Sequence, residues 1–355
     1  MLIEKYLEVV VKQRGSDLHI SAGLPPVVRI DGKLQRMDVP ALKPEEVELL
    51  LFPMLNKEQR RKLEQDWELD MSYGIHGLGR FRVNVYKNNG TYAAAFRTIN
   101  TEVPSFEKLG LPPIVRKITE RPRGLILVTG PTGSGKSTTL ASMIDYINET
   151  RNEHILTIED PIEFIHKSKK SVVHQRELGQ DTRSFANALR SALREDPDII
   201  LVGELRDLET ISLAITAAET GHLVMGTLHT SSASQTIDRI IDVFPEGQQQ
   251  QIRVQLANSL VAVFSQTLLP KRQPDGSKKG RVMAQEIMVV TPAIANLIRE
   301  AKAAQIYSTI QTSSGSGMQT LESALANLYK QGLVTLDDAM SKSSKPAELK
   351  RLIQG

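Results

Sequence analysis

The sequence predicts an α/β fold, in which a small α+β domain precedes a core with a mostly parallel sheet and a short helical region follows. Short apolar runs alternate with helical patterns between residues 123 and 290, which is the arrangement of a parallel sheet covered by helices. One of these runs leads through a glycine-rich loop into a helix. Upstream, an alternating segment, a turn and a second strand-like segment indicate a β-hairpin.

Residues 1–110 are expected to form the small α+β domain. It would begin with a helix and continue with strand-like segments such as Pro26–Ile30. In the hairpin that follows, Gly79–Tyr86 alternates in residue type, Asn88–Gly90 supplies the turn and Tyr92–Arg97 returns. The prolines of the next stretch place an interdomain linker at residues 111–122.

The core domain is expected at residues 123–290 and a C-terminal helical region at residues 291–355. The expected core strands are 124–129, 154–158, 199–203 and 223–228. Near the end of the core, Lys271–Arg281 is basic and rich in turn-forming residues, which indicates a solvated hairpin loop; contact with anionic lipid is the alternative. Beyond Pro292, apolar residues recur at helical spacing: Ile294, Leu297, Ile298, Leu321, Leu325 and Leu328.

The glycine-rich loop completes the phosphate-binding pattern G-x-x-x-x-G-K-[ST], and its context agrees with that pattern. A short apolar run at 124–129 precedes it, and apolar residues at i, i+3, i+4 and i+7 follow it, so the order is strand, loop and helix. Backbone N–H groups and the helix dipole would bind phosphate oxygens. We therefore predict a nucleoside triphosphate site at Gly130, Pro131, Thr132, Gly133, Ser134, Gly135, Lys136, Ser137 and Thr138. Lys136 would reach the β- and γ-phosphates, and the Ser137 hydroxyl would ligate Mg²⁺.

Two acidic segments follow apolar runs of the core. Asp198–Glu204 ends an apolar strand with an acid, and Gly203 stands where a Walker B element usually has aspartate. Glu204 would then orient Mg²⁺ through its water shell. In Thr157–Glu163, three acids come just after a β-run, and Glu163 is a candidate general base. Spacing alone leaves open which of Glu159, Asp160, Glu163 and Glu204 activates water, and each could instead be a cap or a salt-bridge partner.

Histidines and arginines supply further candidates. Thr220–Thr230 brackets a strand with His222 and His229, which could contact phosphate or a neighbouring domain, or be ordinary histidines. Zinc binding is poorly supported, since further ligands at suitable spacing are missing. In the hairpin, Arg80 and Arg82 project from one face by strand alternation and Arg97 lies on the returning strand. The three arginines could clamp a γ-phosphate, or form a solvated face.

Composition excludes several classes of function. The charge of +3 comes from 44 basic and 41 acidic residues, and aromatics are only 5%, so neither a basic footprint nor stacking platforms for nucleic acid are expected. The absence of cysteine excludes disulfides and thiolate metal sites and suits a reducing cytosol. The N-terminus lacks a signal-peptide profile, and no apolar run reaches membrane-spanning length, so membrane association would be peripheral or through a partner.

Taken together, the loop at 130–138, the acidic box at 159–163, the strand ending in Glu204 and the box Thr220–Thr230 resemble the secretion ATPase superfamily. Within it, the chain resembles the type IV pilus retraction ATPases from Arg14 to nearly its C-terminus. Residues 293–300 resemble the retraction-specific box AIRNLIRE, with Ala295 where the family has arginine. Assembly ATPases of pili and type II secretion generally carry a tetracysteine zinc module and a longer N-terminal part, and this sequence has neither.

This resemblance implies a homohexameric ring in which each PAS-like N-terminal domain packs on a neighbouring RecA-like core. It implies that Lys136 and Ser137 bind phosphate and Mg²⁺, that Glu163 is the catalytic base and that Glu204 supports the metal. It further implies that His222 and His229 sense the nucleotide state. The hairpin residues Arg82 and Arg97, with Arg80 as a further candidate, would act as charge-stabilising fingers.

The activity implied is ATP hydrolysis that drives pilus retraction in the cytoplasm, at the inner-membrane face of the pilus machine, on an inner-membrane platform protein. ATP would draw the N-terminal domain onto the phosphates, and the linker would absorb the hinge motion. An assembly or type II secretion ATPase is the nearest alternative. A nucleic-acid motor and a nucleotide switch without catalysis are the others.

Overall fold

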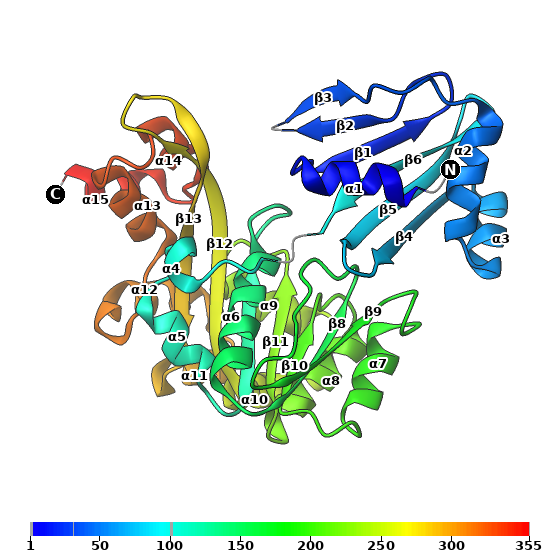
Figure 1. Ribbon diagram of the computed structural model, residues 1–355. Helices are drawn as coiled ribbons and strands as arrows, with labels where there is room; N and C mark the ends of the chain where they lie inside the picture. Colours follow the sequence, from blue (N-terminus) through cyan, green and yellow to red (C-terminus); the bar gives the residue numbers. More distant parts are fainter. Residues whose placement is uncertain (1–2, 31, 100–101, 355) are drawn as a thin grey trace. The chain divides into compact units, whose positions relative to one another are not determined.

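The computed structural model describes residues 3–30, 32–99 and 102–354 (Figure 1). The chain divides into two compact units. Unit 1 comprises Met1–Thr101 and Glu163–Ile165, and unit 2 comprises Glu102–Ile162 and His166–Gly355. Within the described residues, no helix has the length and apolar character needed to cross a bilayer.

Unit 1 is built on an antiparallel sheet. In sheet order, its six strands in the described residues are β3 (Lys33–Arg36), β2 (Val27–Ile30), β1 (Asp17–Ser21), β6 (Thr91–Thr98), β5 (Gly79–Asn88) and β4 (Glu68–Ile75). The helices are α1 (Glu4–Lys12), α2 (Pro44–Leu51) and α3 (Lys57–Asp66), with a short 3₁₀ turn, η1 (Phe52–Met54). The predicted N-terminal helix and the predicted hairpin are both present, as α1 and as the pair β5–β6.

Strand alternation gives the sheet of unit 1 one apolar and one polar face. Phe81, Val83 and Val85 on β5 are buried, and they belong to the same apolar core as Leu7 of α1 and Val47 of α2. Because side chains alternate along a strand, the residues between them project to the opposite face. That opposite face carries the arginines described below.

Unit 2 contains a seven-stranded sheet that confirms the predicted fold class. In sheet order, its strands are β13 (Lys278–Val289), β12 (Leu260–Arg272), β7 (Gly124–Thr129), β11 (Leu223–Leu228), β10 (Ile199–Val202), β8 (His154–Glu159) and β9 (Val172–Glu177). All neighbouring pairs are parallel except β12 and β13. The four predicted core strands correspond to β7, β8, β10 and β11, whereas β9, β12 and β13 were not predicted.

Helices cover both faces of this sheet. Along β7, Ile126 and Val128 pack with one helical layer, while Leu125 and Leu127 pack with the other. The first layer consists of α4 (Phe106–Leu109), α5 (Pro113–Thr119) and α6 (Lys136–Thr150), and Figure 1 shows α5 and α6 together on this face. The second consists of α7 (Phe185–Ala192), α8 (Leu208–Glu219), α9 (Ala233–Asp242), α10 (Glu246–Ser259), α11 (Pro292–Arg299) and α12 (Ile306–Thr312), with a 3₁₀ turn, η2 (Ala303–Gln305), before α12.

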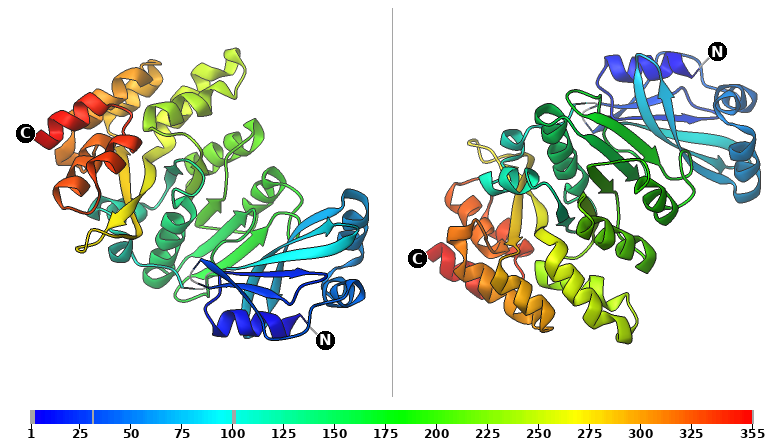
Figure 2. Two further views of the ribbon diagram at one scale, coloured as in Figure 1. Left: turned by 90° about the horizontal axis from the view of Figure 1, so that it is seen from above. Right: turned by 90° about the horizontal axis from the view of Figure 1, so that it is seen from below.

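The hairpin β12–β13 packs both with the main sheet and with the C-terminal helices. Phe264 and Ile287 pack in the core of the main sheet, whereas Leu269 and Ala284 pack with the C-terminal helices. After the 3₁₀ turn η3 (Ser314–Ser316), these helices are α13 (Leu321–Lys330), α14 (Leu336–Lys342) and α15 (Pro346–Gln354). Figure 2 shows them gathered around the hairpin in both views.

One sequence-based boundary needs correction. Residues 111–122 do not form a free linker, since α5 occupies most of this stretch and its Val115 and Ile118 are buried in the core of unit 2. The units instead meet in the chain at Thr101–Glu102. The predicted solvated hairpin loop at 271–281 is present: residues 273–277 form the turn, and the flanking residues end β12 at Arg272 and begin β13 at Lys278. Its residues are mostly exposed on both faces, so the sequence shows no alternation there.

Candidate functional site

The predicted phosphate loop lies between β7 and α6, as the sequence indicates. Leu140, Met143, Ile144 and Ile147 of α6 are all buried, which confirms the predicted stripe. Gly135 precedes the helix at φ 88°, a left-handed conformation that favours glycine. At Gly130, a Cβ atom would lie 2.2 Å from the carbonyl oxygen of Gln266, so only glycine fits against β12 there.

Lys136 folds back over this loop. Its side chain is buried, and Nζ donates to the carbonyl oxygens of Gly130 at 2.8 Å and Pro131 at 3.2 Å. Ser137 follows in the first turn of α6, a helix of 15 residues. The loop therefore presents an ammonium group, a hydroxyl group and a helix N-terminus together, which is the chemistry of an anion site for phosphates.

Parallel strands bring further candidates to the same edge of the sheet. In sheet order, the strands ending at this edge are β7, β11, β10 and β8. Gly130 follows β7, His229 follows β11, Glu204 comes two residues after β10, and Glu159 ends β8. The structure thus places the loop, His229, Glu204 and Glu159 in order along one edge, where ligands bind in open α/β sheets.

Glu204 is contacted by two side chains, Arg206 and His229. Arg206 Nε lies 2.5 Å from Glu204 Oε1, and His229 Nε2 lies 3.2 Å from the same atom. Burial alone would raise the pKa of Glu204, but hydrogen bonds from Arg206 and His229 outweigh it and hold the pKa below its ordinary value. Glu204 is therefore ionised at neutral pH. Arg206 was not predicted from the sequence, although its place two residues after the acid was available as a signal.

Close packing explains why Gly203 replaces the usual aspartate. A Cβ atom at this position would lie 3.2 Å from Glu159 Cα and 3.2 Å from the carbonyl oxygen of Ile158. The carbonyl of Gly203 accepts a hydrogen bond from Thr227 Oγ1 at 2.6 Å. Glu159 itself is oriented by the Thr157 hydroxyl at 2.6 Å, which makes it a structural partner of the strand ends.

The two predicted histidines lie at opposite ends of β11. His222 precedes the strand, and its Nδ1 lies 3.0 Å from the carbonyl oxygen of Ala217 in α8. Of the two, His229 is the one that shares the sheet edge of the phosphate loop. The sequence showed one histidine at each strand end but gave no basis for separating their roles.

The arginines lie on the polar face of the sheet in unit 1. Arg82 and Arg97 are register partners on β5 and β6, and both are exposed. Arg97 Nε donates to Asp17 Oδ1 at 3.0 Å, whereas Arg80 donates to the Ser72 hydroxyl at 2.6 Å. Among the described residues, the guanidinium of Arg82 has no hydrogen-bond or ion-pair partner. Of the three, Arg82 is the one with its guanidinium available.

Glu163, the candidate base, is exposed and belongs to the short segment that groups with unit 1. No hydrogen bond or ion pair engages its carboxylate among the described residues. It is therefore grouped with the arginines and not with the phosphate loop, and its role as a base stays a prediction.

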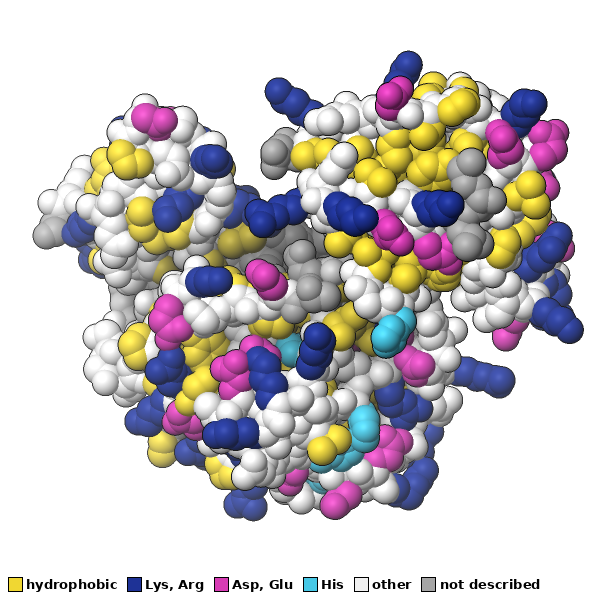
Figure 3. All heavy atoms as spheres, viewed as in Figure 1, with side chains coloured by type: hydrophobic (Ala, Val, Ile, Leu, Met, Phe, Trp, Pro, Cys, Tyr) yellow, Lys and Arg dark blue, Asp and Glu magenta, His cyan; other side chains and the backbone are white. Residues whose placement is uncertain are grey.

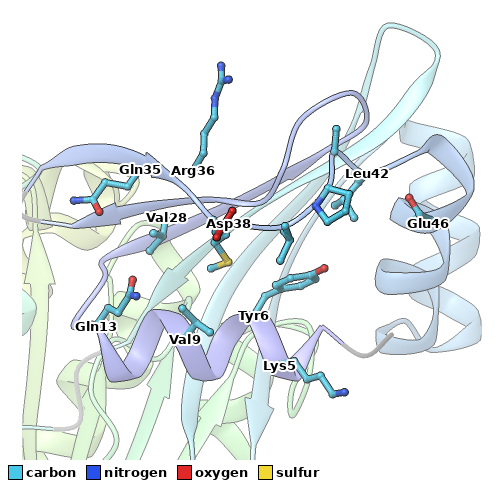
Figure 4. A pocket seen from close by; sticks show the side chains of 14 residues that line it. Lys5, Tyr6, Val9, Gln13, Val28, Gln35, Arg36, Asp38, Leu42 and Glu46 are labelled. Atoms are coloured by element: carbon cyan, nitrogen blue, oxygen red, sulfur yellow. The ribbon is translucent and has the colours of Figure 1, made fainter.

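Each unit also has a cavity away from the loop. One of about 590 Å³ in unit 1 is walled by α1, Val28 and the segment from Gln35 to Leu42 (Figure 4). Its charged side chains balance, with Lys5 and Arg36 against Asp38 and Glu46. Another of about 890 Å³ lies in unit 2 and includes Gly124 at the amino end of β7; Ala295, where the resemblance expects arginine, lines it and is 8% exposed. Figure 3 shows basic and acidic side chains interspersed over the visible face, in keeping with the near balance of charge.

Comparison with known proteins gives a consistent result. The family model described as type II/IV secretion system protein matches residues 1–341. The chain is 54% identical over 346 residues, 98% of this chain and 99% of the relative, to the Type IV pilus retractation ATPase PilT of Pseudomonas aeruginosa. It is also 54% identical over 318 residues, 90% of this chain and 84% of the relative, to the Twitching motility protein of Neisseria gonorrhoeae.

One solved structure extends the likeness to three dimensions. The crystal structure of the pilus retraction motor PilT with bound ADP superposes with a TM-score of 0.91 at 52% identity, covering 99% of each chain. That protein binds a nucleotide, which is the ligand class that the loop between β7 and α6 fits in the present chain.

Proposed function

The chain belongs to the type II/IV secretion system protein family, and on that basis we propose that it is an ATPase motor that drives type IV pilus retraction. The observation that carries the proposal is the phosphate loop at the carboxyl edge of the sheet, next to the pair formed by Glu204 and His229. The retraction role rests on the 54% identity, over 98% of this chain, to a retraction ATPase.

ATP would bind with its phosphates against the loop backbone and the start of α6. Lys136 would exchange the carbonyl oxygens of Gly130 and Pro131 for β- and γ-phosphate oxygens. This exchange keeps the ammonium group hydrogen-bonded in both states, so binding does not leave a buried charge without a partner.

Mg²⁺ fits the donor groups at this edge. The ion prefers oxygen ligands, keeps several waters and is usually bound by one or two protein groups together with phosphates. Ser137 offers a hydroxyl group and Glu204 offers an ionised carboxylate. Among the described residues, no group of three or more His, Cys, Asp or Glu side chains is placed to hold a metal by itself. When bound, Mg²⁺ would neutralise charge on the phosphate oxygens. Ser137 would hold it directly and Glu204 through water.

The two candidate acids are given different roles: Glu204 supports the metal, and Glu163 activates the attacking water. Glu204 is engaged by Arg206 and His229, which suits a supporting role, while the carboxylate of Glu163 is exposed and suits the role of base. Arg82 and Arg97, with Arg80 as a further candidate, would stabilise charge on the γ-phosphate. His229 and His222 would report the nucleotide state, His229 through its contact with Glu204.

The working assembly in this proposal is a homohexamer, in which the N-terminal domain closes on a RecA-like core when ATP binds. The ring would act in the cytoplasm at the inner-membrane face of the pilus machine, on an inner-membrane platform protein. Membrane association would be peripheral only. Nucleic acid is not expected as a partner, since the formal charge of the chain is only +3.

The first test is phosphate release from ATP by the purified protein beside Glu204→Ala and Lys136→Ala, with the oligomeric state of each sample measured by light scattering. We expect a six-subunit wild type that hydrolyses ATP and two inactive variants with the hexamer intact. Absence of turnover from a well-formed wild-type hexamer would contradict the proposed function. Full activity of Glu204→Ala would remove Glu204 from the metal site.

A further inference from the structure

A buried polar side chain from β12 supports the phosphate loop from behind. Gln266 is 3% exposed, and its Nε2 donates to the carbonyl oxygen of Ser134 at 2.8 Å. Its Oε1 accepts from the Thr139 hydroxyl at 3.0 Å, within the first turns of α6. Gln266 therefore contacts both the loop and the helix that the loop opens.

The neighbouring strand fixes the orientation of this amide. Gln285 of β13 is the register partner of Gln266, is also 3% exposed, and its Nε2 donates to Gln266 Oε1 at 3.1 Å. A backbone carbonyl can only accept, so the nitrogen of the Gln266 amide must face Ser134. Its oxygen must then face the two donors, Thr139 and Gln285.

Gln285 is in turn attached to the segment that leads into the C-terminal helices. Gln319 Nε2 donates to the carbonyl oxygen of Gln285 at 2.9 Å. The main chains of Ile287 and Gln319 are also hydrogen-bonded to each other in both directions. The three glutamines thus form a continuous path from this segment across two strands to the loop.

We propose that Gln266 is a positioning residue for nucleotide binding: it fixes the peptide groups around Ser134 so that the loop N–H groups are aimed at phosphate, and Gln285 fixes Gln266. The inference rests on the proposed function only in taking the loop as the nucleotide site. Strands are stiffer supports than loops, so a side chain on β12 can hold the loop in one shape. Hydrogen bonds are also stronger in this buried setting than in water.

Glycine packing supports the same assignment. The loop approaches β12 so closely that a Cβ at Gly130 would collide with the Gln266 carbonyl, and a Cβ at Gly135 would lie 3.3 Å from Gln266 Nε2. The backbone and the side chain of one residue therefore shape both ends of the loop.

The decisive variants change the hydrogen-bonding capacity of this residue and little of its volume. Gln266→Met keeps the shape and removes every hydrogen bond of the amide. Gln266→Glu keeps the shape, but an ionised carboxylate cannot donate to the Ser134 carbonyl. Gln255→Met is the matched control. Gln255 lies on α10, outside the loop, and its Nε2 donates to Glu219 of α8 at 2.8 Å.

Binding of a fluorescent ADP analogue and steady-state ATP hydrolysis are then measured on the intact hexamer. For Gln266→Met we expect the Kd for ADP and the KM for ATP to rise about tenfold, with kcat within twofold. The tenfold rise corresponds to the net free energy of about one buried hydrogen bond, the bond to Ser134 that orients the loop. Gln285→Met should give the same split with a smaller rise. Gln255→Met should match the wild type.

A pH profile separates positioning from general loss of structure. Burial raises the pKa of a carboxyl, and the side chain introduced by Gln266→Glu regains a donor when it is protonated. Gln266→Glu should therefore bind ADP poorly at pH 8.5 and recover at pH 6, relative to the wild type at each pH. A constant deficit, or wild-type affinity in Gln266→Met, would overturn the inference while leaving the motor intact. A wild type that binds ADP without hydrolysis would overturn the proposed function alone, and one that binds no nucleotide would overturn both.

Discussion

His229 Nε2 lies 3.2 Å from Glu204 Oε1, which joins the end of β11 to the end of β10 beside the phosphate loop. The ionisation of Glu204 therefore depends both on its burial and on its two neighbours, Arg206 and His229. Burial raises the pKa of the Glu204 carboxyl, while Arg206 and His229 lower it further than burial raises it.

The first prediction concerns the pH dependence of turnover. Removing Arg206 leaves the raising effect of burial with less opposition, so the pKa of Glu204 should increase. The acid limb of the kcat/KM profile should move to higher pH in Arg206→Ala than in the wild type. Lys117→Ala, which removes an exposed cation elsewhere on unit 2, should leave the limb in place. An unchanged acid limb in Arg206→Ala would separate this pair from catalysis.

Two glycines of the loop should differ sharply in their tolerance of alanine. Gly130→Ala places a Cβ 2.2 Å from the Gln266 carbonyl, so the loop must shift and nucleotide binding should be lost. Gly133 has φ 78° but no atom within 4 Å of its Cβ position, so Gly133→Ala should cost only about 1 kcal/mol of backbone strain. Titration of the two variants with ADP by calorimetry makes the comparison. Equal affinities would show that the loop adapts freely.

Restoring the usual aspartate at position 203 should not improve the enzyme. Any Cβ there meets the backbone of Ile158 and Glu159 at 3.2 Å, so Gly203→Asp and Gly203→Ala should both lose roughly 1–2 kcal/mol of stability. Urea unfolding of the wild type and both variants measures this loss. A gain in turnover by Gly203→Asp would indicate that the strand ends can separate to admit a second metal-supporting acid.

Glu286 should make stability depend on pH. Burial raises the pKa of this carboxyl to about 7, despite the hydrogen bond from the Ala233 N–H and with help from Glu322. The folded state therefore binds this proton more tightly than the unfolded state, and stability falls as pH rises through 7. Glu286→Gln keeps an acceptor for Ala233 and cannot ionise.

We expect Glu286→Gln to match the wild type at pH 5 and to exceed it by roughly 2 kcal/mol at pH 8.5. Thermal unfolding of the two proteins across this range provides the measurement, with the exposed Glu8→Gln as a control that should show no such divergence. Parallel curves at all pH values would place the proton elsewhere.

Arg82 should matter for turnover and not for folding. Its guanidinium is exposed and has no partner among the described residues, so Arg82→Ala should change stability by less than about 0.5 kcal/mol. If it stabilises charge on the γ-phosphate, kcat should fall about a hundredfold or more. Arg61→Ala, on the exposed side of α3, is the matched control. Unchanged turnover in Arg82→Ala would exclude the arginine clamp.

Local patterns predicted the parts of the site that depend on local geometry. The loop at 130–138 needs only a strand before it and an amphipathic helix after it, and both can be predicted from about 25 residues of sequence. The position of Glu204 at the sheet edge could be predicted because it is an acid that directly follows an apolar run. The edge strand β9 and the exposed ends of β12 and β13 next to their turn could not be predicted. Partly or fully exposed strands carry charged and polar residues without an apolar pattern.

Long-range contacts account for what sequence could not supply. Gln266 contacts residues more than 120 positions away in the chain, and a single glutamine in an apolar run carries no sign of that. The difference between His222 and His229 likewise depends on the direction of β11 in the sheet. The order and direction of the strands in the sheet, which cannot be obtained from the sequence, determine the contacts of Gln266 and the separation of the two histidines.

Because β12 and β13 pack both with the main sheet and with the C-terminal helices, these helices are not joined to the nucleotide-binding sheet by a flexible tether. A stiff two-stranded ribbon connects them, held by main-chain hydrogen bonds from Ala262–Val289 to Arg272–Lys278. The C-terminal helices and the phosphate loop therefore share one support, because α13 and α14 pack against these two strands and Gln266 of β12 is hydrogen-bonded to Ser134 of the loop.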